Sequence, residues 1–198
     1  MTSRRDTVRA LAGFAVLPLF RRLGSDDPLE LGQRAHTLAE QRRSEPQSLR
    51  ALSTSEHEIV VSAAERIIPR TTTPGATDAR VADFIEVMLT DWYDAAERDR
   101  FRSGLRELDA STKARYRHGF VEAGARQQIE ILERFDRELQ GKRQAGAAGA
   151  DDHWFAMLKH LTAWGYYTSR VGISGELGED GIPGRFDGNA LYKGNVGD

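Results

Sequence analysis

The side chains best able to hold a metal ion or move a proton in this chain are five histidines. Only two of them share an expected helix face, and seven residues at ~1.5 Å rise place these two about 10 Å apart, too far to hold one metal ion directly. No H-E-x-x-H or E-x-x-H spacing occurs, although zinc and di-iron sites in helical proteins use such spacings. We therefore expect surface or core-edge histidines. The five are His36, His57, His118, His153 and His160, of which the last two form the pair.

Other residue types that carry chemistry also lack a catalytic pattern. The chain contains no cysteine, which excludes disulfides, thiol catalysis, thiolate-ligated iron–sulfur clusters and covalent haem at a C-x-x-C-H site. No serine lies in a G-x-S-x-G elbow, and the glycines lack G-x-G-x-x-G and Walker spacings. Asp180, Asp187 and Asn189 could contact calcium, but the ligand order of an EF-hand is missing. We expect no catalytic residue, cofactor or metal in this chain, so any redox centre would lie on another chain.

The charge composition argues against a nucleic-acid partner. The 198 residues include 28 Lys and Arg against 30 Asp and Glu, a formal net charge of −2. Nucleic-acid binders usually carry a basic excess or stripe. The short basic run at 113–119 is better explained as a solvated helix face. The length suggests one domain, and a hydrophobic content of 39% is enough for a core.

The spacing of apolar residues predicts helices along most of the chain, because no run alternates with a period of two over more than a few residues. Ser53 with Glu56 three residues later indicates a capping box, and Pro69 ends the helix that follows it. In the helix expected after residue 123, Ile129 is one of the side chains predicted to face inward, with Leu132, Phe135 and Leu139. Helices are expected over about 29–43, 53–68, 78–92, 94–108, 123–139 and 152–170, with a short helix after Ser111 and a flexible link at 141–152.

These elements predict an all-α fold, an irregular helical bundle with a glycine-rich, extended C-terminal tail. Residues 25–52 form a polar helical lead-in, and residues 53–198 form the helical domain. Its tail, 171–198, holds eight of the 19 glycines, yet apolar residues such as Ile173 and Phe186 are spaced along it. Ordering so many glycines is unfavourable for the tail alone. Such a segment suits docking across a surface, either its own bundle or a second protein.

Residues 1–24 have the layout of a targeting segment. The apolar run at 10–20 is too short for a membrane span of ~20 residues but fits a signal-peptide hydrophobic region. Arg4 and Arg5 after Ser3 resemble a twin-arginine export signal, matched only in part by the residues that follow. No clear A-x-A cleavage site follows. An ordinary amphipathic N-terminal helix is the alternative interpretation.

Three segments together resemble the gluconate 2-dehydrogenase subunit 3 family. They are the E-R-I-I-P, T-P-G-A and D-F-I motifs within 63–92, the segment 104–116, and G-Y-Y-T-S with P-G-R-F-D-G within 161–188. The resemblance covers about 55–190 in order, behind a leader of the kind that members often have. One departure is at 70–73, where members often place acidic residues.

The resemblance implies a small, cofactor-free accessory subunit of a periplasmic sugar or sugar-acid dehydrogenase. Its partners would be a large FAD-binding flavoprotein of the glucose–methanol–choline type and a c-type cytochrome carrying haem c. The accessory subunit would support folding, export or stability of the flavoprotein. It would leave the cytoplasm by the twin-arginine route with that partner, and would associate with the inner membrane through the complex.

We expect partner contacts at the end of the last helix and in the tail, because interfaces favour Tyr, Trp, Phe and Arg. Gly165 would allow a close approach by another helix or a partner backbone, although glycine costs roughly 1 kcal/mol against alanine within a helix. An alternative is that Trp164 and Tyr166 belong to the core. Two other functions stay open: a stand-alone helical structural protein, and an enzyme that uses His160 with a nearby acid. The expected contact residues are Trp164, Gly165, Tyr166, Tyr167, Arg170, Arg185 and Phe186.

Overall fold

The computed structural model describes residues 27–44, 50–147, 149 and 152–177, and within these ranges all regular structure is helical. The predicted all-α class is therefore confirmed. The elements are α3 (Pro28–Gln41), a 3-10 turn η1 (Arg42–Ser44), α4 (Thr54–Ile67), α5 (Val81–Asp91), α6 (Ala95–Tyr116), α7 (Ala125–Gln144), α8 (Trp154–Thr168) and α9 (Arg170–Leu177).

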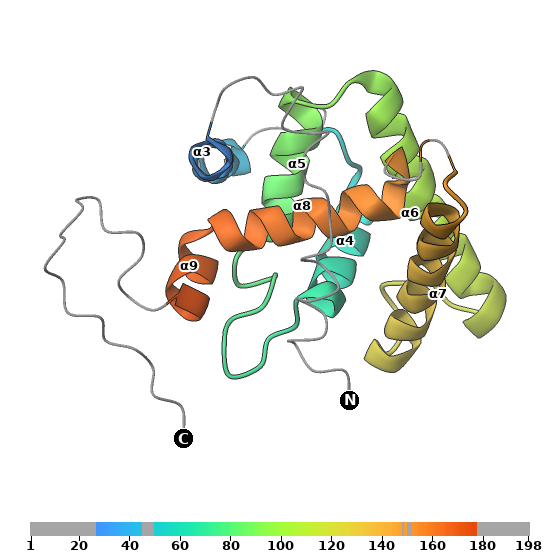
Figure 1. Ribbon diagram of the computed structural model, residues 1–198. Coiled ribbons are helices and arrows are strands. Elements are labelled where there is room, and N and C mark those ends of the chain that lie inside the picture. Colours follow the sequence, from blue (N-terminus) through green and yellow to red (C-terminus); the bar gives the residue numbers. More distant parts are fainter. Residues whose placement is uncertain (1–26, 45–49, 148, 150–151, 178–198) are drawn as a thin grey trace, which may run out of the picture.

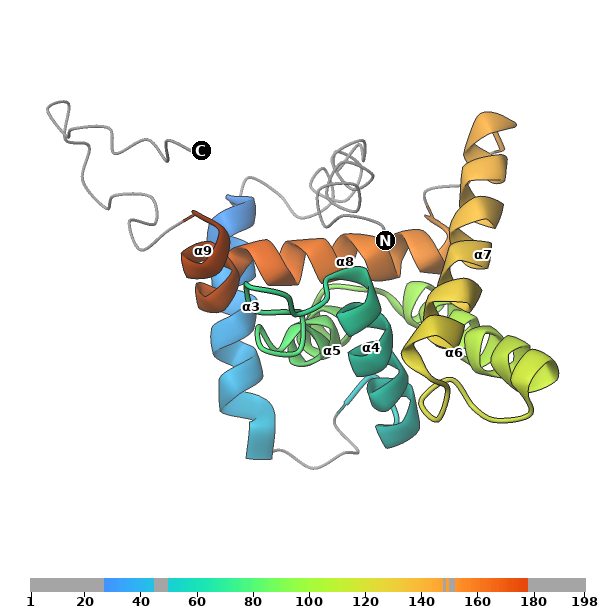
Figure 2. The ribbon, with the colours of Figure 1, turned by 90° about the horizontal axis from the view of Figure 1, so that it is seen from below.

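Helix α8 is the centre of the fold. It lies across the molecule, with α3 and α9 near one end and α6 and α7 near the other, while α4 and α5 pack along its length (Figures 1 and 2). Twelve of its fifteen residues are buried, and a helix that is apolar nearly all round must be enclosed by others. Aromatic rings fill the space around it, including Phe84, Phe101, Phe135 and Tyr166, each with no exposed surface.

Two helix starts follow directly from the sequence. The capping box predicted at Ser53 and Glu56 is confirmed, with the Ser53 hydroxyl accepting from the Glu56 N–H and the Glu56 carboxylate accepting from the Ser53 N–H. Asp94 and Glu97 form a second box at α6. The Glu56 carboxylate also accepts from Arg102 Nε at 3.1 Å, which ties α4 to α6. Burial alone would raise the pKa of Glu56, but these hydrogen bonds outweigh it and the pKa lies below its usual range.

The predicted break near residue 108 is wrong, because α6 continues without interruption to Tyr116. The short helix predicted after Ser111 is instead the last part of α6. In the structure the Asp109 carboxylate accepts from the Phe120 N–H at 2.8 Å, and the Ser111 hydroxyl accepts from Arg134. Both polar side chains serve contacts outside the helix rather than a new cap.

The inward face predicted for the next helix is also partly wrong. Ile129 is 41% exposed, whereas Ile131 is buried. Gln128 turns inward beside it, since its amide donates to the Phe120 carbonyl at 2.9 Å. Helix α7 also extends to Gln144, so the predicted link at 141–152 begins later than expected.

The expected tail begins with a helix. Residues 171–177 belong to α9, so this part of the tail is helical rather than extended. Residues 178–198 lie outside the described residues. The lead-in helix α3 packs on α5 and α8, and the Cβ of any side chain at Gly32 would lie 2.5 Å from Thr168 on α8.

Candidate docking surface

Two of the expected contact residues on α8 are buried and form hydrogen bonds with other parts of the same chain. Tyr166 has no exposed surface, and its hydroxyl donates to the Pro74 carbonyl at 2.8 Å. Trp164 is 8% exposed, and its ring N–H donates to the Pro28 carbonyl at 3.0 Å. The alternative that these two residues belong to the core accounts for both positions.

Gly165 allows the close approach that its place in a helix suggested, and the approaching groups belong to the same chain. A Cβ at this position would lie 2.6 Å from Cδ1 of Phe84 on α5. His36 on α3 contacts the Gly165 carbonyl through Nε2 at 2.7 Å and packs on the Phe84 ring at a centroid distance of 4.8 Å. Burial lowers the pKa of His36, opposed by that hydrogen bond.

The corner between α8 and α9 carries the expected contact residues that still have exposed surface. Tyr167 is half-buried and Arg170 is exposed. The corner is tight, since the Ser169 hydroxyl donates to the Tyr166 carbonyl at 2.7 Å and accepts from the Gly172 N–H at 2.9 Å. The expected contacts Arg185 and Phe186 and the export pair Arg4 and Arg5 lie outside the described residues.

Residues 69–80 form a loop with several internal and anchoring hydrogen bonds, called the proline loop below. The Glu65 carboxylate accepts from the backbone N–H groups of Arg70 and Thr77 at 2.8 and 2.9 Å. Burial alone would raise the pKa of Glu65, but these hydrogen bonds outweigh it and lower the pKa. Asp78 accepts from the Gly75 N–H at 2.8 Å and pairs with Arg70. The loop is thus held by two carboxylates, Glu65 from α4 and Asp78 from the loop itself.

The proline loop lies between α9 and α4 in both ribbon views (Figures 1 and 2). A Cβ at Gly175 on α9 would lie 3.1 Å from the Pro74 ring. Together with the hydrogen bond from Tyr166 to Pro74, this contact fixes the loop against the α8–α9 corner. The loop, the corner and α9 therefore form one continuous surface.

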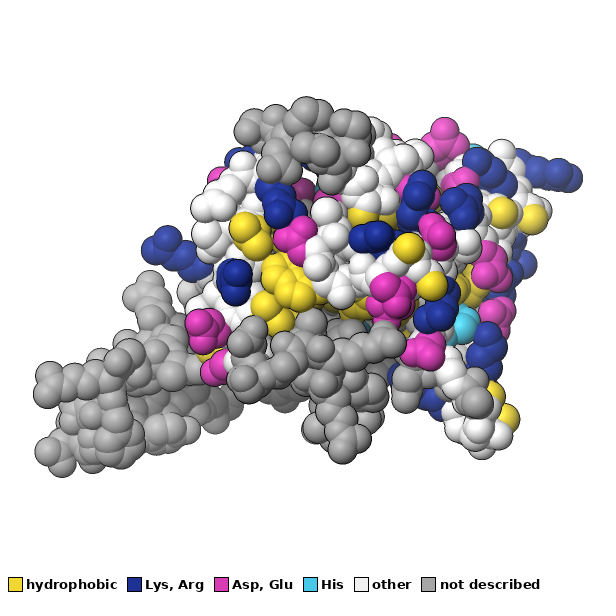
Figure 3. All heavy atoms as spheres, turned by 90° about the horizontal axis from the view of Figure 1, so that it is seen from above, with side chains coloured by type: hydrophobic (Ala, Val, Ile, Leu, Met, Phe, Trp, Pro, Cys, Tyr) yellow, Lys and Arg dark blue, Asp and Glu magenta, His cyan; other side chains and the backbone are white. Residues whose placement is uncertain are grey.

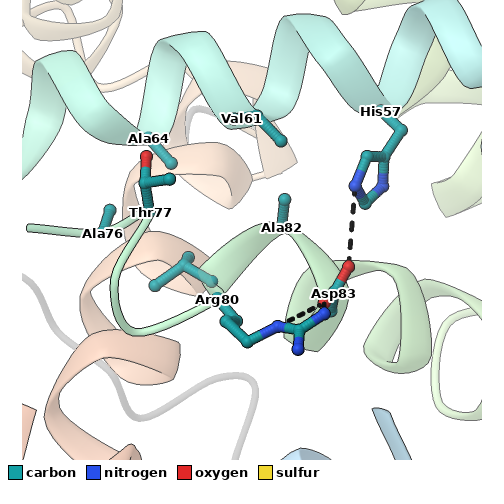
Figure 4. A pocket seen from close by; sticks show the side chains of 9 residues that line it. His57, Val61, Ala64, Ala76, Thr77, Arg80, Ala82 and Asp83 are labelled. Carbon is teal, nitrogen blue, oxygen red and sulfur yellow. Dashed lines mark hydrogen bonds and ion pairs between the residues drawn. The ribbon is translucent and has the colours of Figure 1, made fainter. Parts of the chain in front are cut away.

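A small cavity opens on the other side of the proline loop, between α4 and the start of α5 (Figure 4). Its volume is about 100 Å³. Short aliphatic side chains face the space, while polar side chains stand around it. The cavity is lined by His57, Val61, Ala64, Ala76, Thr77, Arg80, Val81, Ala82 and Asp83.

One carboxylate contacts two of the polar side chains of this cavity, and the second of them, His57, also lies 3.6 Å from Glu86 through Nδ1. Asp83 Oδ2 accepts from Nε and Nη2 of Arg80 at 2.9 and 2.6 Å, and Asp83 Oδ1 lies 3.6 Å from Nε2 of His57. Arg80 also has a left-handed backbone, with φ of 54°. The sequence alone does not indicate this site, because no pattern of residue types predicts a left-handed arginine or a cavity lined by alanine.

The groups with metal-binding or acid–base capacity form no larger constellation in the part of the chain that the structure describes. No cluster of three or more His, Asp or Glu side chains suited to a metal ion occurs there. Burial lowers the pKa of His160 to about 4, so its imidazole is neutral at neutral pH. Among the same residues, no helix combines the length and apolarity needed to cross a membrane.

Acidic and basic side chains are intermixed over the face shown in Figure 3, with a patch of apolar side chains among them. The described part of this face therefore presents no broad area of a single charge. This agrees with the near balance of charges in the composition.

Comparison with protein families gives one match to most of the domain. The family model described as "Gluconate 2-dehydrogenase subunit 3" matches residues 54–184, more than half of the chain. The match begins at the first residue of α4 and includes the proline loop, the cavity, α8 and α9, whereas α3 precedes it. Comparisons with curated proteins and with solved structures gave no significant match.

Proposed function

Because the chain belongs to the gluconate 2-dehydrogenase subunit 3 family, we propose that it is the cofactor-free accessory subunit of an FAD-dependent sugar or sugar-acid dehydrogenase. Members of this family are subunits of a multi-subunit dehydrogenase complex, so partner subunits are implied. In our proposal the large subunit, a flavoprotein of the glucose–methanol–choline type, takes hydride from the substrate hydroxyl. Electrons then leave through a c-type cytochrome that carries haem c.

The family match carries this proposal, and the chemistry of the chain supports the accessory role. Cysteine, the residue that would attach a c-type haem or an iron–sulfur cluster, is missing from the whole sequence. Burial lowers the pKa of His160, the residue considered for catalysis, to about 4, which makes its imidazole a weak base at neutral pH. The oxidation chemistry would therefore belong to the partner subunits.

The α8–α9 corner supports a docking role for the end of the described chain. Tyr167 and Arg170 combine an aromatic side chain and an arginine, the residue types enriched at protein interfaces. Arg185 and Phe186 in the following segment are proposed contacts for the same reason. In contrast, Trp164, Gly165 and Tyr166 would support this surface from within, since they pack against α3, α5 and the proline loop.

Export completes the proposal. Arg4 and Arg5 would direct twin-arginine export of a folded pair, in which the flavoprotein has loaded FAD in the cytoplasm. The accessory subunit would then stabilise the flavoprotein in the periplasm, at the inner membrane through the complex. The stand-alone structural protein is the competing function.

Capture from the native host tests the proposal. A tagged copy of the full chain should bring down a large subunit with the absorbance spectrum of a bound flavin, and the complex should reduce a dye with a sugar or sugar acid. The separated chain should reduce no dye. A chain that purifies alone as a monomer, or one that oxidises a sugar unaided, would refute the accessory role.

A further inference from the structure

The cavity beside the proline loop has the properties of a binding site for one side chain. We propose that it accepts an aliphatic side chain of the large subunit, and that Arg80 pairs with a carboxylate next to that side chain. This inference rests on the proposed function and adds a specific contact to it.

The size of the cavity selects its occupant. Pockets for cofactors and drug-sized ligands usually measure ~300–1,000 Å³, whereas this cavity measures about 100 Å³. A space of this size suits a single side chain. Protein interfaces commonly place such an anchor in a pocket near their centre.

The walls of the cavity select an apolar occupant. Val61 and Ala64 on α4 face Ala82 on α5 across the space, and Ala76 of the proline loop closes one side (Figure 4). Ala64, Ala76 and Ala82 are buried, and Val61 is partly exposed. Short aliphatic walls offer no hydrogen bond to the deepest part of an occupant, and burying an unpaired polar group is costly.

Arg80 is held at the edge of this cavity with capacity for another acid. Its Nε and Nη2 donate to Asp83, and Nη1 forms a longer ion pair with Glu40 at 3.8 Å. The side chain is 44% exposed. A guanidinium has five N–H donors and binds carboxylates in a fork geometry, so the N–H groups of Arg80 that make no hydrogen bond to Asp83 can donate to a carboxylate of the large subunit.

The backbone of Arg80 supports the same conclusion. Its φ of 54° is a conformation that glycine adopts without cost and that is unfavourable for arginine. Strained residues of this kind cluster at functional sites. At Arg80 this conformation carries a side chain that pairs with Asp83 beside the cavity, whereas the left-handed Arg117 lies at the end of α6 and does not line the cavity.

The position of the cavity connects it to the proposed docking surface. Ala76 and Thr77 of the proline loop line the cavity, and Pro74 of the same loop contacts α9. Helix α9 ends at Leu177, where the described chain ends. A partner bound to α9 would reach the cavity across this one loop.

Two variants test this inference, each with a matched control elsewhere on the chain. Arg80→Gly removes the guanidinium and also removes the unfavourable left-handed conformation of a non-glycine residue. Arg117→Gly is its control, since Arg117 is also left-handed, with φ of 71°, at the end of α6. Val61→Phe fills the cavity, and Val121→Phe adds the same bulk at a site that is 43% exposed in the turn before α7. The measurement is the dissociation constant for the large subunit, purified from the captured complex and separated from the chain.

We expect Arg80→Gly and Val61→Phe to raise this dissociation constant by about tenfold or more, as hot-spot residues do, and both controls to change it by less than about threefold, as contact-free sites do. Both glycine variants should unfold at or above the wild-type temperature. If Val61→Phe fails to fold, Arg80→Gly decides alone. If Arg80→Gly binds the large subunit with the wild-type dissociation constant, this inference is wrong, while the accessory role is unaffected because the chain still captures the flavoprotein. Failure of the wild-type chain to bind any flavoprotein overturns both.

Discussion

Replacing Gly165 by alanine would measure how closely α8 and α5 approach. Alanine is favoured over glycine within a helix by about 1 kcal/mol, which alone would stabilise the protein. However, the added Cβ would lie 2.6 Å from Cδ1 and 3.0 Å from Cγ of Phe84, a ring with no exposed surface that cannot move into solvent. Crowding of this kind costs about 1–3 kcal/mol. The net change in unfolding free energy should be a loss of about 0–2 kcal/mol.

Gly141→Ala is the matched control, because it lies in α7 with no atom within 4 Å of the added Cβ. It should gain about 1 kcal/mol, so the two variants should differ by the crowding alone, about 1–3 kcal/mol. Urea denaturation followed by circular dichroism at neutral pH measures both values. Equal stabilisation by the two substitutions would refute the close approach at Gly165. The bulkier Gly165→Leu should disrupt this packing further and lower the activity of the assembled complex.

Three further expectations concern stability. The pKa of His160 is lowered from 6.5 to about 4, so its stabilising effect is present above pH 6.5 and is lost as pH falls toward 4. Between about pH 8 and pH 5, the unfolding free energy of the wild type should fall by about 2 kcal/mol more than that of His160→Gln, as measured by urea denaturation. An equal fall in the two proteins would contradict this. Tyr166→Phe removes the hydrogen bond to Pro74 and should lower the unfolding free energy by about 1 kcal/mol. An unchanged denaturation midpoint would show that this hydrogen bond does not stabilise the protein. Glu56→Gln keeps a capping side chain but removes the charge beside Arg102, and should cost about 1–3 kcal/mol in thermal unfolding at low salt.

Local chemistry made several elements predictable from the sequence. The box at Ser53 and Glu56 depends on residues three apart, and Pro69 stops α4 by lacking an N–H. Helix α8 has apolar residues on nearly all sides, so its position at the centre follows from composition as well as spacing. Such features need no knowledge of distant residues.

The misplaced features depend on contacts between distant residues. Gln128 is buried in place of Ile129 because the Phe120 carbonyl accepts its amide hydrogen bond. Helix α6 continues past the predicted break at residue 108, and its Asp109 carboxylate accepts from the Phe120 N–H. In each case a polar side chain forms a hydrogen bond with a backbone group eight to eleven residues away. The spacing of apolar residues along the sequence does not indicate such hydrogen bonds.

The motif at 164–167 shows why a recognisable segment and a binding surface are different things. Its aromatic and glycine positions were expected to face a partner, yet Trp164 and Tyr166 bind backbone carbonyls of the lead-in helix and of the proline loop. Their effect on a partner would be indirect, through the position of α9 and the loop. Arg80, Tyr167 and Arg170 lie on the outside of the elements so positioned. In the proposed complex the partner would contact this outer set, and substitutions at the inner set would weaken binding through their effect on folding.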